Sequence, residues 1–168
     1  MSATTLVSFP PIADDRATRL ILGSMPGAAS LAANEYYAHR HNAFWRIMAS
    51  LNGAVPDALY ALRIRALQDA RIALWDVLQS CERPGSLDAS IVRATEVGND
   101  FAAFFAAHPA ITQVFFNGAA AAAAFKRHHP SLLRHSKLRF QPLPSTSPAH
   151  AAMRFEQKLA LWRDALAL

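Results

Sequence analysis

The chain has 168 residues, of which 52% are hydrophobic and 17% charged, a balance that predicts one folded domain and excludes a disordered chain. Its net charge of +5 and isoelectric point near 10 favour an anionic partner, most often nucleic acid, although a merely basic surface gives the same balance. Cys81 is the single cysteine, which excludes a disulfide framework and a cysteine-held iron–sulfur cluster.

No apolar run approaches the ~20 residues that a membrane helix needs. Residues 1–13 also lack the basic end and apolar core of a secretory signal. We therefore expect no membrane partner and, in line with the cysteine usage, a cytoplasmic location.

Residues 1–17 include a Pro-Pro turn and predict an irregular lead-in to a single domain spanning residues 1–168. Apolar runs and their boundaries then predict alternating strands and helices. In chain order these are a strand over 19–24, helices over 42–51 and 57–69, a strand over 71–78, a turn at 85–88 leading to a short helix, a helix from 99 that ends at Pro109, a strand over 112–116, a helix over 119–127, a strand over 137–141 and a helix over 149–166.

This alternation predicts an α/β fold, namely a three-layer α/β/α sandwich around a central four-stranded, mostly parallel sheet. Ligands of such sheets bind beyond the carboxyl ends of the strands. Segments 23–27, 75–76, 117–118 and 144–148 lie at or just after those ends. We therefore expect their side chains to share one site.

A polar cluster at 39–42 stands between two aromatic pairs, Tyr36-Tyr37 and Phe44-Trp45. One interpretation is a loop that caps a helix, with Asn42 as the N-cap and the aromatic residues in the core. The other is the wall of a pocket, where aromatic faces hold a flat ligand and an amide orients water or reads an edge. The two interpretations are compatible, because a helix start holds a pocket residue rigidly.

Two motifs resemble those of a known family. Gly23-Ser24-Met25-Pro26-Gly27, followed by His39-Arg40-His41-Asn42-Ala43-Phe44-Trp45, is similar to the first motif of the uracil-DNA glycosylase superfamily. Leu143-Pro144-Ser145-Thr146-Ser147-Pro148-Ala149 resembles the second motif. The resemblance covers residues 18–165, and is closer to the hypoxanthine-DNA glycosylase branch than to the mismatch-specific branch.

The resemblance implies roles for individual residues. Asn42 matches the catalytic amide of the hypoxanthine branch and is expected to orient the attacking water, while Asn117 matches a second active-site amide that could pair with the base edge. The expected base-binding residues are Tyr37, Asp76, Ser24 and Met25. Met25 departs from the Asp or Asn with which other branches direct water.

The resemblance further implies that Ser145, Thr146, Ser147 and His150 belong to a loop that enters the minor groove and binds phosphates. A basic stretch over 126–137 could border the DNA as well, although such a stretch is usually a solvated face.

Simpler interpretations stay open for the same residues. Asn117 would be a helix cap, Asp76 a solvated loop carboxylate and Tyr37 an ordinary core or rim aromatic. Ser147, which precedes Pro148, would be the N-cap of the last helix.

The resemblance implies a DNA repair enzyme, a monofunctional DNA-deoxyinosine glycosylase that flips the nucleotide out and hydrolyses its N-glycosidic bond to release hypoxanthine. The expected partner is DNA with deaminated bases, bound by a monomer. We expect no cofactor and no metal, because the histidines lack accompanying ligands at metal-binding spacing. The alternatives are a uracil or mismatch glycosylase on the same scaffold and a non-catalytic DNA-binding module.

Overall fold

The computed structural model describes residues 3–168 and has a central sheet of four parallel strands. These are β2 (Arg19–Gly23), β3 (Ile72–Asp76), β6 (Gln113–Asn117) and β7 (Arg139–Leu143), in the spatial order β3-β2-β6-β7. From β2 the chain connects first to β3 on one side, and it later returns to β6 on the other. The carboxyl end of β2 therefore lies where ligands bind in sheets of this kind.

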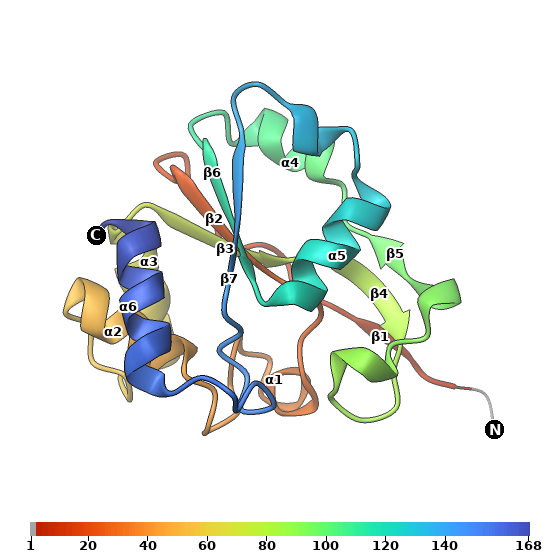
Figure 1. Cartoon of the computed structure of the whole chain (residues 1–168), viewed down its shortest axis with the longest axis horizontal. Coiled ribbons are helices and arrows are strands. Elements are labelled where there is room, and N and C mark those ends of the chain that lie inside the picture. The colour runs from red at the N-terminus through yellow and green to blue at the C-terminus, as the bar shows by residue number, and fades with distance from the viewer. Residues whose placement is uncertain (1–2) are drawn as a thin grey trace.

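Helices cover both faces of this sheet, which confirms the predicted three-layer α/β/α sandwich. Figure 1 shows α2 (Phe44–Asn52), α3 (Tyr60–Asp69) and α6 (Phe155–Leu166) on one side of the strands, with α4 (Phe101–Ala107) and α5 (Ala119–His128) on the other. Among residues 3–168, none of these helices is both long and apolar enough to cross a bilayer.

Alternating side chains of the strands divide the core into two parts. Leu20 and Leu22 of β2 pack with Phe101 and Phe125 beneath α4 and α5. Ile21, between them, packs on the opposite face with a cluster that includes Trp162 of α6. Successive residues of a strand point to opposite faces, so a continuous apolar run fills both layers.

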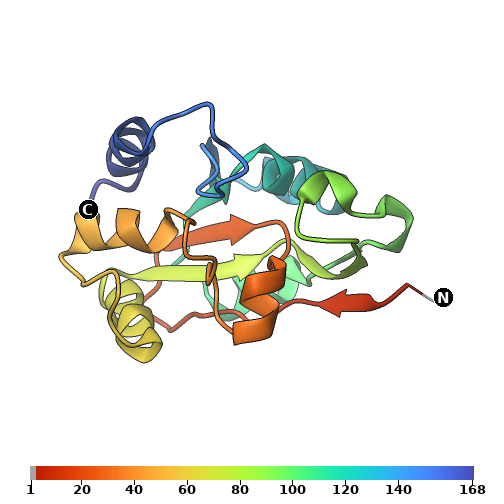
Figure 2. The ribbon, with the colours of Figure 1, turned by 90° about the horizontal axis from the view of Figure 1, so that it is seen from below.

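A second sheet, which the sequence did not predict, lies beside the first. It is antiparallel and consists of β1 (Thr5–Val7), β4 (Leu78–Glu82) and β5 (Val97–Gly98), in the order β1-β4-β5. The predicted strand over 71–78 is confirmed for Ile72–Asp76 but wrong at its end, because a bend at Val77 carries the chain from β3 in one sheet to β4 in the other. Figure 2 shows this passage from below.

The expectation of an irregular lead-in over 1–17 is also wrong in part. Leu6 of β1 pairs with Cys81 of β4, and Ile12 forms an isolated bridge with Leu74 of β3. These pairings fix a segment whose two adjacent prolines indicated only a turn.

Three predicted helices begin later than expected. α2 starts at Phe44 rather than Asn42, α3 at Tyr60 rather than Asp57, and α6 at Phe155 rather than Ala149. In each case the preceding residues form turns or irregular backbone. At the start of α6, Oε1 of Gln157 accepts a hydrogen bond from the backbone N–H of Arg154. Ser147 is therefore not the N-cap of the last helix. A short helix, α1 (Ala28–Ala33), was not predicted.

The alanine run of α5 provides a test of this packing. Ala124 is buried against the core at 2% exposure, whereas the neighbouring Ala123 is exposed. We expect Ala124→Leu to lower the free energy of unfolding by about 1–3 kcal/mol through overpacking. Ala123→Leu should change it by no more than about 0.5 kcal/mol. Urea unfolding of both variants measures the difference, and equal effects would contradict the placement of α5.

Candidate functional site

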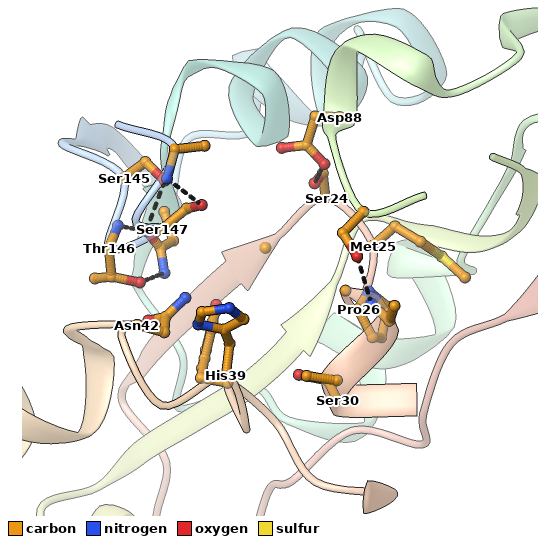
Figure 3. A pocket seen from close by; sticks show the side chains of 18 of the residues that line it. Ser24, Met25, Pro26, Ser30, His39, Asn42, Asp88, Ser145, Thr146 and Ser147 are labelled. Carbon is orange, nitrogen blue, oxygen red and sulfur yellow. Dashed lines mark hydrogen bonds between the residues drawn. The ribbon is translucent and has the colours of Figure 1, made fainter. Parts of the chain in front are cut away.

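A cavity of about 290 Å³ opens at the carboxyl ends of the parallel strands. Its lining comes from the last residues of β2, β3 and β6 and from the segments that follow β2, β4 and β7. In Figure 3, Ser145, Thr146 and Ser147 form one side, and Ser24 and Asp88 face them across the cavity. Every residue predicted for the site lines this cavity except His150, which follows the loop that does.

The floor of the cavity lies where β2 ends, at Gly23. A β-carbon on this glycine would lie 2.5 Å from Oδ1 of Asp76 and 3.1 Å from the hydroxyl of Tyr37. The two side chains therefore occupy the space that a side chain at position 23 would need. Glycine permits this close approach because it has no β-carbon.

Asp76 is the most perturbed carboxyl group at this site. Its residue is only 3% exposed, and its Oδ2 atom has no hydrogen-bond partner within the described residues. Burial first, and then the charge of Asp88, raise the pKa of Asp76 to about 7, with Arg83 acting in the opposite direction. The interpretation of Asp76 as a solvated loop carboxylate is therefore wrong.

Tyr37 presents a buried hydroxyl and a stacked ring. Its backbone is left-handed, with φ of 54°, and its ring stacks on Phe44 with centroids 4.2 Å apart. Its hydroxyl has no hydrogen-bond partner of standard geometry within the described residues. Burial first, and then the charge of Asp76, raise the pKa of the Tyr37 phenol, while the nearby Asn117 amide acts in the opposite direction, so the hydroxyl is neutral at physiological pH.

Asn42 lies beside His39 at the edge of the cavity (Figure 3). Its Oδ1 atom accepts the backbone N–H of Phe44 at 2.9 Å, while the N-cap position of α2 belongs to Ala43. Asn42 is therefore not the N-cap of α2. It lies one residue before the N-cap and accepts a hydrogen bond from the first residue of the helix. One lone pair of Oδ1 and both N–H groups of the amide stay available to a ligand.

Asn117 is bound to Thr146 by both ends of its amide. Its Nδ2 donates to Oγ1 of Thr146 at 2.9 Å, and its Oδ1 accepts the backbone N–H of Thr146 at 2.9 Å. The N-cap of α5 is Gly118, so Asn117 is not the helix cap. The backbone carbonyl of Thr146 in turn accepts the N–H of Ala43 at 2.9 Å, which links the segments of the two amides.

A further wall comes from the segment over 85–88, which the sequence predicted only as a turn leading to a short helix. Ser24 donates a hydrogen bond to Asp88, the Ser86 hydroxyl accepts the N–H of Ala28 at 3.0 Å, and Arg83 donates to the carbonyl of Pro26 at 2.7 Å. These contacts bring Ser86, Leu87 and Asp88 to the cavity. In the sequence, the one sign that this segment belongs to the site is the presence of Ser86 and Asp88 in the turn after the predicted strand.

Some predicted residues are placed differently from the rest. Met25 lines the cavity but is only 6% exposed and belongs to the core, and Figure 3 shows its side chain pointing away from Asn42. His150 does not line the cavity. Its backbone carbonyl accepts a hydrogen bond from Nζ of Lys158 at 2.9 Å.

The basic stretch over 126–137 is not free to bind DNA along its whole length. Arg127 and His128 both contact Glu96, at 2.8 Å, and Glu96 is almost buried. Arg127 and His128 also lie at the C-terminal end of α5. The ten residues of this helix span about 15 Å, and the cavity lies at its other end. Within residues 3–168, no three histidine, cysteine, aspartate or glutamate side chains are grouped so that they could hold a metal ion.

Comparison with known proteins agrees with this arrangement. The family model described as the uracil DNA glycosylase superfamily matches residues 10–166. A hypoxanthine DNA glycosylase of Methanosarcina barkeri is 38% identical over 111 residues, covering 66% of this chain and 69% of the relative. A hypoxanthine DNA glycosylase of Methanosarcina acetivorans is 34% identical over 143 residues, covering 84% of this chain and 86% of the relative.

A solved structure extends the likeness to three dimensions. A solution structure from Methanosarcina acetivorans, whose description proposes a uracil DNA glycosylase, superposes with a TM-score of 0.80 at 30% identity, covering 98% of this chain and all of the other. The chain belongs to the uracil DNA glycosylase superfamily.

Proposed function

We propose that this protein is a monofunctional DNA glycosylase that releases hypoxanthine from deoxyinosine in DNA. The observation that carries the proposal is the single cavity in which Asn42, Asn117, Tyr37 and Asp76 meet. The names of two relatives, both hypoxanthine DNA glycosylases, support the choice of base.

The nucleotide flips out of the duplex and enters the cavity base first. Tyr37, whose ring is held by stacking on Phe44, contacts the base. Asn42 orients water toward the anomeric carbon as the sugar gains oxocarbenium character.

Asn117 acts in two ways. It holds Thr146 in place through two hydrogen bonds, and its remaining N–H is available to the base. The loop of Ser145, Thr146, Ser147 and His150 lies against the DNA backbone. Among residues 3–168, no lysine lines the cavity, which supports hydrolysis without a Schiff base and therefore without strand cleavage.

A second candidate is a uracil glycosylase. The description of the similar solution structure favours it, and the uracil ring is smaller than the purine that the cavity would otherwise hold.

The first test is base release from oligonucleotides that contain inosine, uracil or xanthine, followed by alkali to cleave abasic sites. We expect fastest release from inosine and intact strands before alkali. Faster release of uracil would support the second candidate. No release from any substrate would leave the non-catalytic DNA-binding alternative, and cleavage before alkali would contradict the monofunctional reaction.

The second test separates the chemistry of Asn42 from its bond to the helix. Asn42→Ser keeps an oxygen that can accept the N–H of Phe44, so the melting temperature should stay near that of the parent. We expect single-turnover release to fall about 10-fold or more nevertheless, because the hydroxyl cannot reproduce the geometry of the amide. Full activity of Asn42→Ser would overturn the catalytic assignment.

Asn117→Ala and Thr146→Val provide the comparison for this test. Losing a base-edge contact costs about 1–3 kcal/mol, so Asn117→Ala should slow release unequally for different bases. Thr146→Val removes one partner of Asn117 but keeps the amide, and it should slow all bases alike. An equal loss for every base in Asn117→Ala would assign Asn117 to loop positioning alone.

The third test concerns charge near the cavity. Arg40 is exposed and lies two residues before Asn42, whereas Lys126 is exposed near the far end of α5. We expect Arg40→Ala to weaken binding to inosine-containing duplex and to reduce the salt slope by about one, because a phosphate contact releases counterions. Lys126→Ala should change neither. The reverse pattern would place the DNA along α5.

A further inference from the structure

Two unpartnered polar groups belong to residues that line the cavity beside Gly23. Oδ2 of Asp76 and the hydroxyl of Tyr37 are both buried, and neither has a hydrogen-bond partner within the described residues. Both side chains face the space above Gly23. Buried polar groups are almost always paired, so two such groups at one end of a cavity indicate the place of a ligand.

The surroundings of Asp76 determine its protonation. The ionisable groups that act with it are Asp88 and Arg83 from the loop after β4, and the phenols of Tyr36 and Tyr37 from the segment before α2. Arg83 is engaged with the carbonyls of Pro26 and Gly85, so it does not neutralise Asp76 by direct contact. Burial first, and then the charge of Asp88, raise the pKa of Asp76 to about 7. A protonated Asp76 is therefore abundant at neutral pH.

The chemistry of these groups selects an edge of the base. A 6-oxopurine carries two neighbouring acceptors, N7 and O6, on one edge, whereas the next edge places the N1–H donor beside O6. A protonated carboxyl and a neutral phenol are two neighbouring donors.

We propose that Asp76 is the general acid of this site, protonating N7 of the departing 6-oxopurine while Tyr37 donates a hydrogen bond to O6. This inference rests on the proposed function and deepens it. Asp76 acts on the leaving base, whereas Asn42 orients the attacking water.

The reaction balances without a further reactant. The proton of the Asp76 carboxyl passes to N7, the bond between N9 and the anomeric carbon breaks, and its electron pair stays on the purine. Water forms the new bond to the anomeric carbon and loses one proton to solvent, from which Asp76 is protonated again. The products are neutral hypoxanthine and an abasic sugar.

Asp88 sets the working range of this acid without contacting the base. It accepts a hydrogen bond from Ser24, and its negative charge disfavours a second negative charge on Asp76. Adenine presents a donor in place of O6, so the phenol of Tyr37 favours the deaminated base over its parent.

The experiment is single-turnover release of hypoxanthine across about pH 5.5 to 8.5, the range in which a general acid of this kind titrates. We expect the wild-type rate to fall as the pH rises through about 7. Asp76→Asn should be about 100-fold slower at low pH and should lose this pH dependence. Tyr37→Phe should slow release about tenfold and keep it.

Two further comparisons need no change at Asp76. With 7-deazainosine, which lacks N7, the wild-type rate should be slow and independent of pH. Asp88→Asn keeps an acceptor for Ser24 but removes the charge, so the fall in rate should move to lower pH. Asp164→Asn, an exposed change in α6, serves as the matched control and should behave like the wild type.

A stability measurement reports on Asp76 independently of catalysis. The folded protein holds this proton more tightly than the unfolded chain does, so its stability falls as the pH rises from about 4 to about 7. Asp76→Asn removes the ionisation. Its melting temperature relative to the wild type should therefore increase over that interval, while Asp164→Asn should show no such trend.

The contrary results are distinct from failure of the proposed function. A flat wild-type profile, an Asp76→Asn enzyme as fast as the wild type, an unchanged profile with 7-deazainosine, or an Asp88→Asn profile that does not move down would each overturn the inference while hypoxanthine release persists. If the wild type releases no hypoxanthine at any pH, the proposed function fails and the inference fails with it.

Discussion

The site depends on the absence of a side chain at Gly23. This residue ends strand β2, and Asp76 and Tyr37 approach it from two other segments. Any side chain here would displace the carboxyl group and the phenol from their places in the lining of the cavity. The backbone of Tyr37, left-handed without being glycine, is held against this glycine by stacking on Phe44. Strain of this kind persists only where the surroundings fix the conformation.

Hydrogen bonds between loops hold the remaining parts of the cavity. Thr146 is only 1% exposed and binds Asn117 through its side chain and backbone, while its carbonyl binds the residue after Asn42. On the opposite wall, Arg83 and Ser86 tie the loop after β4 to the loop after β2. The cavity is therefore organised before a ligand arrives, as a site needs when its groups must act at defined distances.

Sequence patterns predicted the parts of this molecule that rest on local chemistry. The four parallel strands came from short apolar runs, and the bond from Asn42 to a backbone N–H two residues ahead is a local contact. What could not be predicted rests on contacts distant in the chain. Asn117 resembled a cap because its partner, Thr146, lies 29 residues away.

Two further differences have the same cause. The run over 71–78 is apolar throughout, so nothing in it revealed that Val77 bends the chain from one sheet into another. Asp88 was missed because its place in the cavity comes from a contact with Ser24, 64 residues away. The family motifs identified most of the cavity, while the loop that completes it carried no motif.

The pairing of β1 with β4 has a consequence for handling the protein. Val7 pairs with Ser80 and Leu6 with Cys81, so the first described strand supports the one that leads into Arg83 and the loop of Asp88. Thr5–Val7 contributes no side chain to the cavity. An affinity tag or a deletion that disturbs this strand nevertheless acts on the cavity wall, and enzyme prepared in that way would differ at its site while its sequence there stays intact.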